Sequence, residues 1–236
     1  MKKRLFPAKR ALTAIAVTLV LLGTTACYDH NDFYDQTLKV GNIMLTDLSV
    51  VAPTSYDEEI HHPLGVIYHV SHDTAYVVGM REMGKYAYAT YEIKDSVKAL
   101  APTDGDIADA LEYYRGASEK VTALDGKSST AVLLQKGSPA AIAASNNASV
   151  ISGWYLPSAG ELKKMANNIR EVRFAMRVIA GDEFSSEQYL SSTQDGTSDE
   201  SKKVYCYTVN VTHGYFTTVR KDEPHWVRPS LMVNLR

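Results

Sequence analysis

Apolar and polar residues alternate along two parts of the chain, one toward each end. A period of two is typical of strands because successive side chains of a strand point to opposite faces. The alternation predicts strands over residues 42–45, 64–70, 74–80, 86–90, 189–193, 203–211, 215–220 and 227–235. Residues 71–73 are expected to close one hairpin and the His213-Gly214 turn another.

The middle of the chain has the apolar spacing of helices instead. Helices are predicted over residues 106–114, 130–135, 139–145 and 170–179. The clearest helix begins after Pro157, where Ser158 and Glu161 have the spacing of a capping box. Asn167-Asn168 should end this helix, and Gly181 should end the next one.

The last predicted strand is amphipathic. One face carries Val227, Leu231, Val233 and Leu235, and the other carries Arg228, Ser230 and Asn234. This strand is therefore expected to be half buried. The whole pattern predicts an α+β fold in which strands from both ends of the chain pair in one mixed or antiparallel sheet around the central helices.

Residues 1–26 have the three parts of an export signal: a basic start, an apolar run over residues 11–23 and small residues before Cys27. The apolar run is shorter than the roughly 20 residues that a membrane-spanning helix needs. We expect cleavage before Cys27 and lipidation of its sulfur. In the alternative, ordinary secretion leaves Cys27 to pair with Cys206, the other cysteine of the chain.

Removal of the signal makes the chain acidic. The whole chain has 25 Lys plus Arg and 27 Asp plus Glu, and residues 1–26 hold five of the basic residues, which leaves 20 basic against 27 acidic residues. A polyanion would be repelled, so nucleic acid is not an expected partner. Residues 27–37 are expected to form an acidic tether, and residues 38–236 a single domain.

Several short motifs occur in a recognisable order. They are Gly153-Trp154-Tyr155-Leu156-Pro157-Ser158 with Glu161-Leu162, Tyr189-Leu190-Ser191-Ser192-Thr193, and Val227-Arg228-Pro229. This order resembles the GW-x-LP, SST and VRP motifs of a domain in Bacteroidetes lipoproteins. That domain is related to the Fibrobacter major paralogous domain and to the carboxyl-terminal domain of the Legionella collagen-like protein. Leu190 departs from the pattern, which has an aromatic residue there.

The resemblance covers most of the chain from Val40 onward and implies a C-type-lectin-like fold, which the formylglycine-generating enzyme also uses. Fold alone does not fix function. The acidic residues after Cys27 resemble the export signals of surface lipoproteins in the same bacteria. Display on the cell surface at the outer membrane is therefore expected, with the periplasmic face of that membrane as the alternative.

The residues for the chemistry of related proteins are missing. The copper site of the formylglycine-generating enzyme needs two cysteines, and calcium lectins need more carboxylates and amides than Glu223-Pro224-His225 supplies. Strand parity separates His69 from His72, so no metal site is expected. No nucleophile or cofactor motif occurs, so neither catalysis nor a cofactor is predicted.

The candidate binding residues are aromatic and basic residues near the carboxyl end: Tyr205, Tyr207, Tyr215, Arg220, His225, Trp226 and Arg228. Tyr and Trp make large, rigid contacts, although strand tyrosines also commonly face a core. Thr74 and Ser96 follow aspartate in a pattern resembling Bacteroidetes O-glycosylation sites. We expect a non-enzymatic surface recognition or adhesion lipoprotein that binds a glycan or a protein. The alternatives are a structural or assembly subunit of a surface complex, or an enzyme of unrecognised type.

Overall fold

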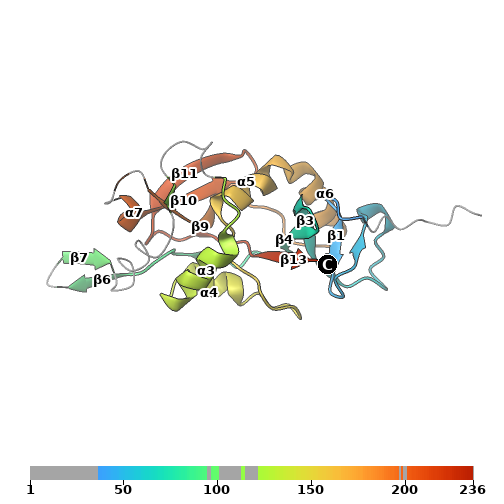
Figure 1. Cartoon of the computed structure of the whole chain (residues 1–236), viewed down its shortest axis with the longest axis horizontal. Helices are drawn as coiled ribbons and strands as arrows, with labels where there is room; N and C mark the ends of the chain where they lie inside the picture. The colour runs from blue at the N-terminus through green and yellow to red at the C-terminus, as the bar shows by residue number, and fades with distance from the viewer. Residues whose placement is uncertain are drawn as a thin grey trace, which may run out of the picture. The chain divides into compact units, whose positions relative to one another are not determined.

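The computed structural model describes residues 37–94, 97–100, 113–114, 122–196, 198 and 201–235. They belong to one compact unit, Asp35–Arg236. The unit combines helices with two mostly antiparallel sheets (Figure 1), so the α+β prediction is confirmed. None of the helices in the described ranges is long and apolar enough to span a membrane.

A five-stranded sheet pairs strands from both ends of the unit, as predicted, although the strands of residues 189–220 form a second sheet instead of joining this one. Its strands are β1 (Ile43–Leu45), β2 (Val50–Val51), β3 (Pro63–Ser71), β4 (Thr74–Gly79) and β13 (Ser230–Asn234), in the order β13-β4-β3-β1-β2. The predicted hairpin is present, because β3 and β4 pair from Gly65 opposite Gly79 to Ser71 opposite Thr74. β13 pairs antiparallel with β4.

The second sheet is built mainly from the carboxyl-terminal part. Its strands are β5 (Lys85–Tyr86), β9 (Tyr189–Asp195), β10 (Tyr205–Asn210), β11 (Tyr215–Arg220) and β12 (His225–Trp226), in the order β11-β10-β9-β12-β5, with β8 (Tyr113–Tyr114) parallel to β9. The predicted hairpin around His213-Gly214 joins β10 and β11. A separate pair consists of β6 (Tyr91–Lys94) and β7 (Val97–Leu100).

The helices are α3 (Gly126–Gln135), α4 (Pro139–Ser145), α5 (Ala159–Asn167), α6 (Ile169–Val178) and the short α7 (Ser201–Val204), with a 3-10 turn η1 (Pro53–Ser55). The predicted capping box is confirmed at the start of α5, where the Ser158 side chain accepts from the Glu161 N–H and the Glu161 side chain accepts from the Ser158 N–H. Asn168 separates α5 from α6, also as predicted.

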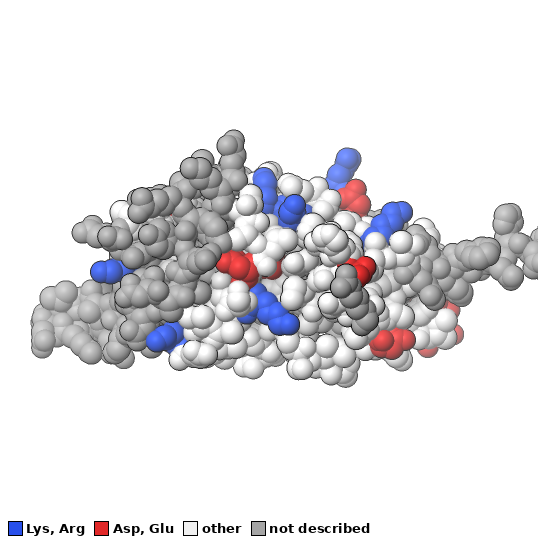
Figure 2. All heavy atoms as spheres, viewed as in Figure 1, with Lys and Arg blue, Asp and Glu red and all other residues white. Residues whose placement is uncertain are grey.

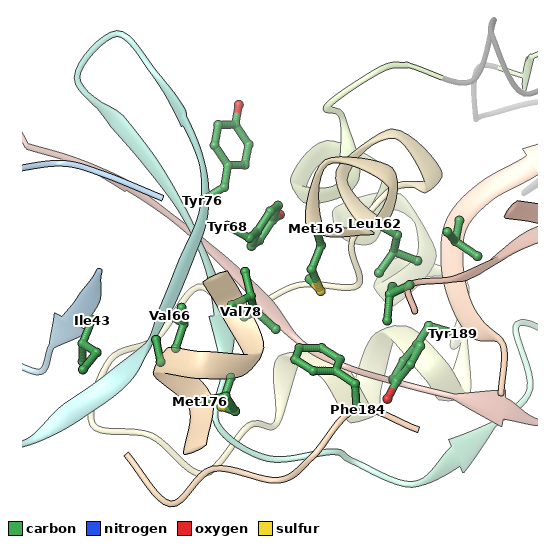
Figure 3. Packing of buried hydrophobic residues seen from close by; sticks show 14 of the residues in the cluster. Ile43, Val66, Tyr68, Tyr76, Val78, Leu162, Met165, Met176, Phe184 and Tyr189 are labelled. Carbon is green, nitrogen blue, oxygen red and sulfur yellow. The ribbon is translucent and has the colours of Figure 1, made fainter. Parts of the chain in front are cut away.

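Helices α5 and α6 supply one side of the largest apolar core. Leu162 and Met165 of α5 and Met176 of α6 belong to the same buried cluster as Val66 of β3 and Tyr189 of β9 (Figure 3). The neighbouring residues of β3 and β4 point the other way, and Ile67 and Val77 pack with Trp154. Both faces of the hairpin are therefore covered, which explains its nearly continuous apolar sequence.

A third apolar cluster lies under α3 and α4. Leu133 and three alanines of α4 pack there with Leu190, Cys206 and Val227. Cys206 is buried in this cluster. The two alternate sets of side chains on β9 and β10 thus enter different cores, because Tyr189 and Tyr207 belong to the first cluster.

The prediction of one half-buried strand over residues 227–235 was wrong. The strand begins only at Ser230, as β13, because residues 227–229 are irregular and follow the separate strand β12. Arg228 and Ser230, on the expected polar face, are both fully buried. The reason is tertiary: Ser230 lies in a backbone bridge with Tyr155, and Arg228 finds buried carbonyl partners. Alternation along one strand carries no information about such partners.

Three other predicted elements also differ. The strand expected over residues 86–90 ends at Tyr86, and the following Tyr88 and Ala89 are buried in irregular backbone. Tyr113–Tyr114 is a strand rather than the end of a helix over 106–114, whose other residues lie outside the described ranges. Lys203 belongs to α7 and not to the strand expected over 203–211, since β10 begins at Tyr205.

Candidate functional site

The predicted aromatic residues of β10 and β11 do not share one surface. Tyr205 and Arg220 are opposite each other in the ladder, whereas Tyr215 lies on the other face of the sheet. Tyr215 is 50% exposed, but Tyr207 is only 6% exposed. The Tyr207 ring packs edge-on against Phe216, with ring centroids 6.4 Å apart. Tyr207 is therefore a core residue and not a binding residue.

His225 and Trp226 lie on β12, between β9 and β5. Trp226 is partly buried against the main core, and the Lys85 ammonium lies 5.3 Å from its ring centroid. Lys85 is itself paired with Glu187 at 2.5 Å. A ligand that stacked on the Trp226 ring from this side would have to displace an ion pair, so we leave Trp226 out of the candidate site.

Arg228 is fully buried and acts as a clamp on backbone carbonyls. Its Nε donates to Gly79 O at 2.9 Å, and its Nη2 donates to Met80 O and Asp182 O, both at 3.1 Å. Its guanidinium also lies 4.5 Å from the centroid of the Phe184 ring. Burial lowers the pKa of Arg228 from its ordinary value, and neighbouring acidic groups oppose that shift. The side chain stays charged and holds strand ends together.

Two of the sequence motifs, Leu156-Pro157-Ser158 and Ser191-Ser192-Thr193, meet at the start of α5. Ser192 N–H donates to Pro157 O at 2.9 Å, and Ala159 N–H donates to the Thr193 hydroxyl at 3.0 Å. The Ser191 hydroxyl donates to Tyr207 O at 2.7 Å. These bonds dock the first turn of α5 onto β9. The hydroxyls of Ser191 and Thr193 therefore satisfy buried backbone groups, which is a structural role, whereas the buried Ser192 hydroxyl has no hydrogen-bond partner among the described residues.

Glu161, in the first turn of α5, is a buried carboxyl. Burial raises its pKa to about 8, while hydrogen bonds from the Ser158 N–H and the Tyr155 hydroxyl oppose the shift. A carboxyl of this kind in a cleft would be a catalytic candidate. Here its two oxygens are 2.9 Å from Ser158 N and 3.2 Å from the Tyr155 hydroxyl, inside the docking contact of α5. Glu161 is a capping residue.

A polar pocket of about 330 Å³ opens at the turn of the β3–β4 hairpin. We call it the hairpin pocket, and it is lined by Ser71, His72, Asp73, Thr74, Tyr76, Met232 and Asn234. Two hydroxyls, an imidazole, a carboxylate, an amide and a phenol thus border one concavity. This mixture can donate and accept hydrogen bonds at closely spaced positions.

Strand pairing brings these residues together. Asn234 lies opposite Thr74 in the β4–β13 ladder, and Leu235 N–H donates to Asp73 O at 3.1 Å. His72 has a positive φ of 53°, so the turn projects its side chain from a backbone conformation that non-glycine residues rarely adopt. The pocket therefore combines a strained turn with the end of a strand from the other end of the unit.

Sequence reasoning found part of this pocket. The sequence indicates Thr74 as a modification candidate and argues against His72 as a metal ligand. Over the described ranges, no three His, Cys, Asp or Glu side chains form a group that could hold a metal ion. Tyr76 and Asn234 were missed. Only the pairing of β13 with β4 reveals them.

Two other predicted sites lie outside the described residues: Cys27 and Ser96. On the face drawn in Figure 2, acidic and basic residues of the described part are interspersed among uncharged ones, and they do not gather into one patch. Comparisons with models of protein families and with curated proteins find no match to the chain. The candidate site therefore depends on its own geometry.

Proposed function

We propose that this chain is a surface lipoprotein without enzymatic activity that recognises a glycan through the hairpin pocket. The observation that carries the proposal is the composition of the pocket wall. His72, Asp73 and Asn234 border it together with two hydroxyls. Sugars present many neighbouring hydroxyls, each a donor and an acceptor, and such ligands need a dense set of complementary polar groups.

The size of the pocket supports a small ligand. Its volume of about 330 Å³ lies near the lower end of the roughly 300–1,000 Å³ common for small-molecule sites. Tyr76 supplies the wall with an aromatic residue, whose ring is tilted against that of His69 with ring centroids 5.2 Å apart. A terminal sugar of a larger glycan fits this description better than an extended apolar peptide, which would lack apolar contacts.

The proposed fold is C-type-lectin-like, and the proposed anchor is a lipid on Cys27 after removal of residues 1–26. The support is the order of the sequence motifs and the three-part export signal. Incorporation of labelled palmitate tests the anchor. A Cys27→Ser variant should lose the label and leave the membrane fraction, whereas a variant that stays equally membrane-bound contradicts lipidation.

A glycan array tests recognition, with and without calcium, using residues 35–236 because they form one compact unit. The wild type should retain a defined subset of glycans. Asn234→Ala and His72→Asn, which keeps a residue tolerant of positive φ, should each weaken binding about tenfold through loss of one or two hydrogen bonds. His62→Asn is the matched control, since His62 is exposed and outside the pocket.

The control should bind as the wild type does. If no glycan binds, or if His62→Asn loses as much affinity as His72→Asn, the hairpin pocket is not a glycan site. Both pocket variants should also keep the melting temperature of the wild type within a few degrees, which separates loss of contact from loss of fold.

A structural or assembly subunit is the second candidate, and strand β11 favours it. β11 is the outermost strand of its sheet, and Tyr215, Thr217 and Thr218 on it are exposed. The edge of a sheet can accept a strand from another protein. Gentle solubilisation of membranes should then co-purify one partner in fixed stoichiometry. A Thr218→Pro variant, which removes an edge N–H, should release that partner.

A further inference from the structure

A second pocket, of about 280 Å³, lies at the opposite end of the same hairpin. We call it the Arg81 pocket, and it is lined by Thr46, Pro63, Leu64, Met80, Arg81, Asn147, Ala148, Ser149 and Val150. The start of β3 and the end of β4 border it, whereas the hairpin pocket lies at the turn. A strand of this length spans roughly 25 Å, so the two pockets are separate sites.

One side of the Arg81 pocket is apolar. Pro63 and Leu64 begin β3, and Met80 directly follows β4. Val150 stands at the rim and is 80% exposed. A ligand that packed between Val150 and the strand ends would remove this side chain from water, at about 25 cal/mol for each Å² of apolar surface covered.

The other side is polar and carries a positive charge. The Arg81 side chain is 60% exposed, and its Nη1 is 2.7 Å from Asp182 Oδ1. A guanidinium has five N–H donors in a planar fork, so this ion pair leaves donors for a carboxylate. Among the described residues, none forms a hydrogen bond with the Asn147 side chain. Its amide can therefore bond to a ligand.

The wall between these two sides is rigid. Arg228 donates to the carbonyls of Gly79 and Met80 and so fixes the end of β4. Gly79 has no side chain, and a Cβ there would lie 3.3 Å from Asn147 Nδ2. The Asn147 amide therefore packs directly over the strand end. A wall that is already ordered costs little entropy when a ligand binds.

We propose that the Arg81 pocket binds a carboxylate on a compact apolar body, such as an apolar residue at the carboxyl end of a peptide or a short free acid. The carboxylate pairs with Arg81. The apolar body packs against Leu64, Met80 and Val150. In a peptide end, the amide that precedes the carboxylate bonds to Asn147.

Binding is measured by ¹H–¹⁵N shifts of labelled residues 35–236, the compact unit, with three probes: N-acetyl-leucine, its amide N-acetyl-leucinamide, and hexanoate. N-acetyl-leucine should shift the signals of residues 80–82 and 147–150 in a saturable way. The uncharged amide should bind about tenfold more weakly, because it lacks the charge-assisted bond. Tighter binding of N-acetyl-leucine than of hexanoate assigns a peptide end, and equal binding assigns a free acid.

Arg81→Gln should weaken N-acetyl-leucine binding about tenfold. Arg177→Gln is the matched control, because Arg177 is 65% exposed, pairs with Glu183 at 3.8 Å and does not line the pocket. It should leave binding unchanged. Asn147→Ala leaves the Arg81–Asp182 pair intact and should weaken N-acetyl-leucine more than hexanoate.

Three results would overturn the proposal: no saturable shifts with either acid, equal binding of N-acetyl-leucine and its amide, or an equal loss in the Arg177→Gln control. None of them bears on the glycan array, because the variants of the two pockets share no residue. If the Arg81 pocket binds no carboxylate, the hairpin pocket therefore remains a candidate glycan site. If the glycan array fails, the Arg81 pocket remains a candidate carboxylate site.

Discussion

Glu161 and Arg228 are two buried ionisable side chains whose partners lie at very different sequence distances. Glu161 bonds to Ser158 and Tyr155, which are 3 and 6 residues away. Arg228 bonds to Asp182, Met80 and Gly79, which are 46, 148 and 149 residues away. Only the first role was predictable, because a capping box is a local pattern and a tertiary clamp is not.

The two residues also differ in how they tolerate burial. A carboxyl can release its charge by binding a proton, whereas a guanidinium stays charged in proteins. Glu161 can therefore remain buried in neutral form at moderate cost. Arg228 needs its carbonyl partners at every pH. Substitutions at the two centres should accordingly differ in size and in pH dependence.

Arg228→Leu should cause the largest loss of stability. It removes the Arg228 bonds to the carbonyls of Gly79, Met80 and Asp182, of which Met80 O keeps a bond from Asp182 N–H. Removal of one partner from a buried charged network costs about 3–5 kcal/mol. Urea unfolding of residues 35–236 measures the change. Arg81→Leu is the control, since its exposed ion pair should contribute less than about 1 kcal/mol. Similar losses in both variants would show that Arg228 is not a clamp.

Gly160→Ala should cause the next largest loss of stability, although replacing glycine by alanine in a helix usually stabilises a protein. Alanine normally stabilises a helix interior relative to glycine by roughly 0.5–1 kcal/mol. A Cβ at Gly160 would lie 2.4 Å from Ala123 O, so α5 would have to move away from residues 122–123. We expect a loss of about 2–3 kcal/mol in thermal unfolding. Gly137→Ala is the control, because no atom lies within 4 Å of its Cβ and only its positive φ opposes alanine.

Ser158→Ala tests the capping box at the start of α5, whose partners are close in sequence. The Ser158 hydroxyl accepts from Glu161 N–H at 3.2 Å and donates to Ala123 O at 2.6 Å. Loss of an N-cap costs about 1 kcal/mol, and the second bond should raise the total to about 2 kcal/mol. Ser158→Thr should keep both bonds and recover most of the stability. A variant as stable as the wild type would mean that the cap contributes little.

The same contrast explains how much of the fold was predictable. The β3–β4 hairpin and the capping box of α5 follow from residues within a few positions of one another. The break between β12 and β13 does not, because Arg228 in that break is held by carbonyls from β4 and from residue 182. Tyr88 is a similar case, since its hydroxyl donates to Ser192 O and its burial ends the predicted strand.

The candidate site was predictable only in part, for the same reason. His72, Asp73 and Thr74 belong to a turn that the sequence indicates. Asn234 joins them through a ladder that spans 160 positions of the chain. The aromatic residues near the carboxyl end were conspicuous in the sequence. The alternation of a strand does not tell which of its faces packs against a core. The face that carries Tyr207 does, so Tyr207 is not available to a ligand.

The smallest effect should be a change in pH dependence at Glu161. Burial raises the pKa of Glu161 to about 8, above the ordinary value of 4.5, so the folded state keeps a proton that the unfolded state releases. The stabilisation is complete at pH values below the unfolded pKa and is lost as the pH rises through about 8. Between about pH 6.5 and pH 7.5 the free energy of unfolding should fall by about 1 kcal/mol more in the wild type than in Glu161→Gln, which cannot ionise. Two parallel curves would instead show that the helix N-terminus, whose dipole favours a carboxylate, keeps Glu161 charged throughout this range.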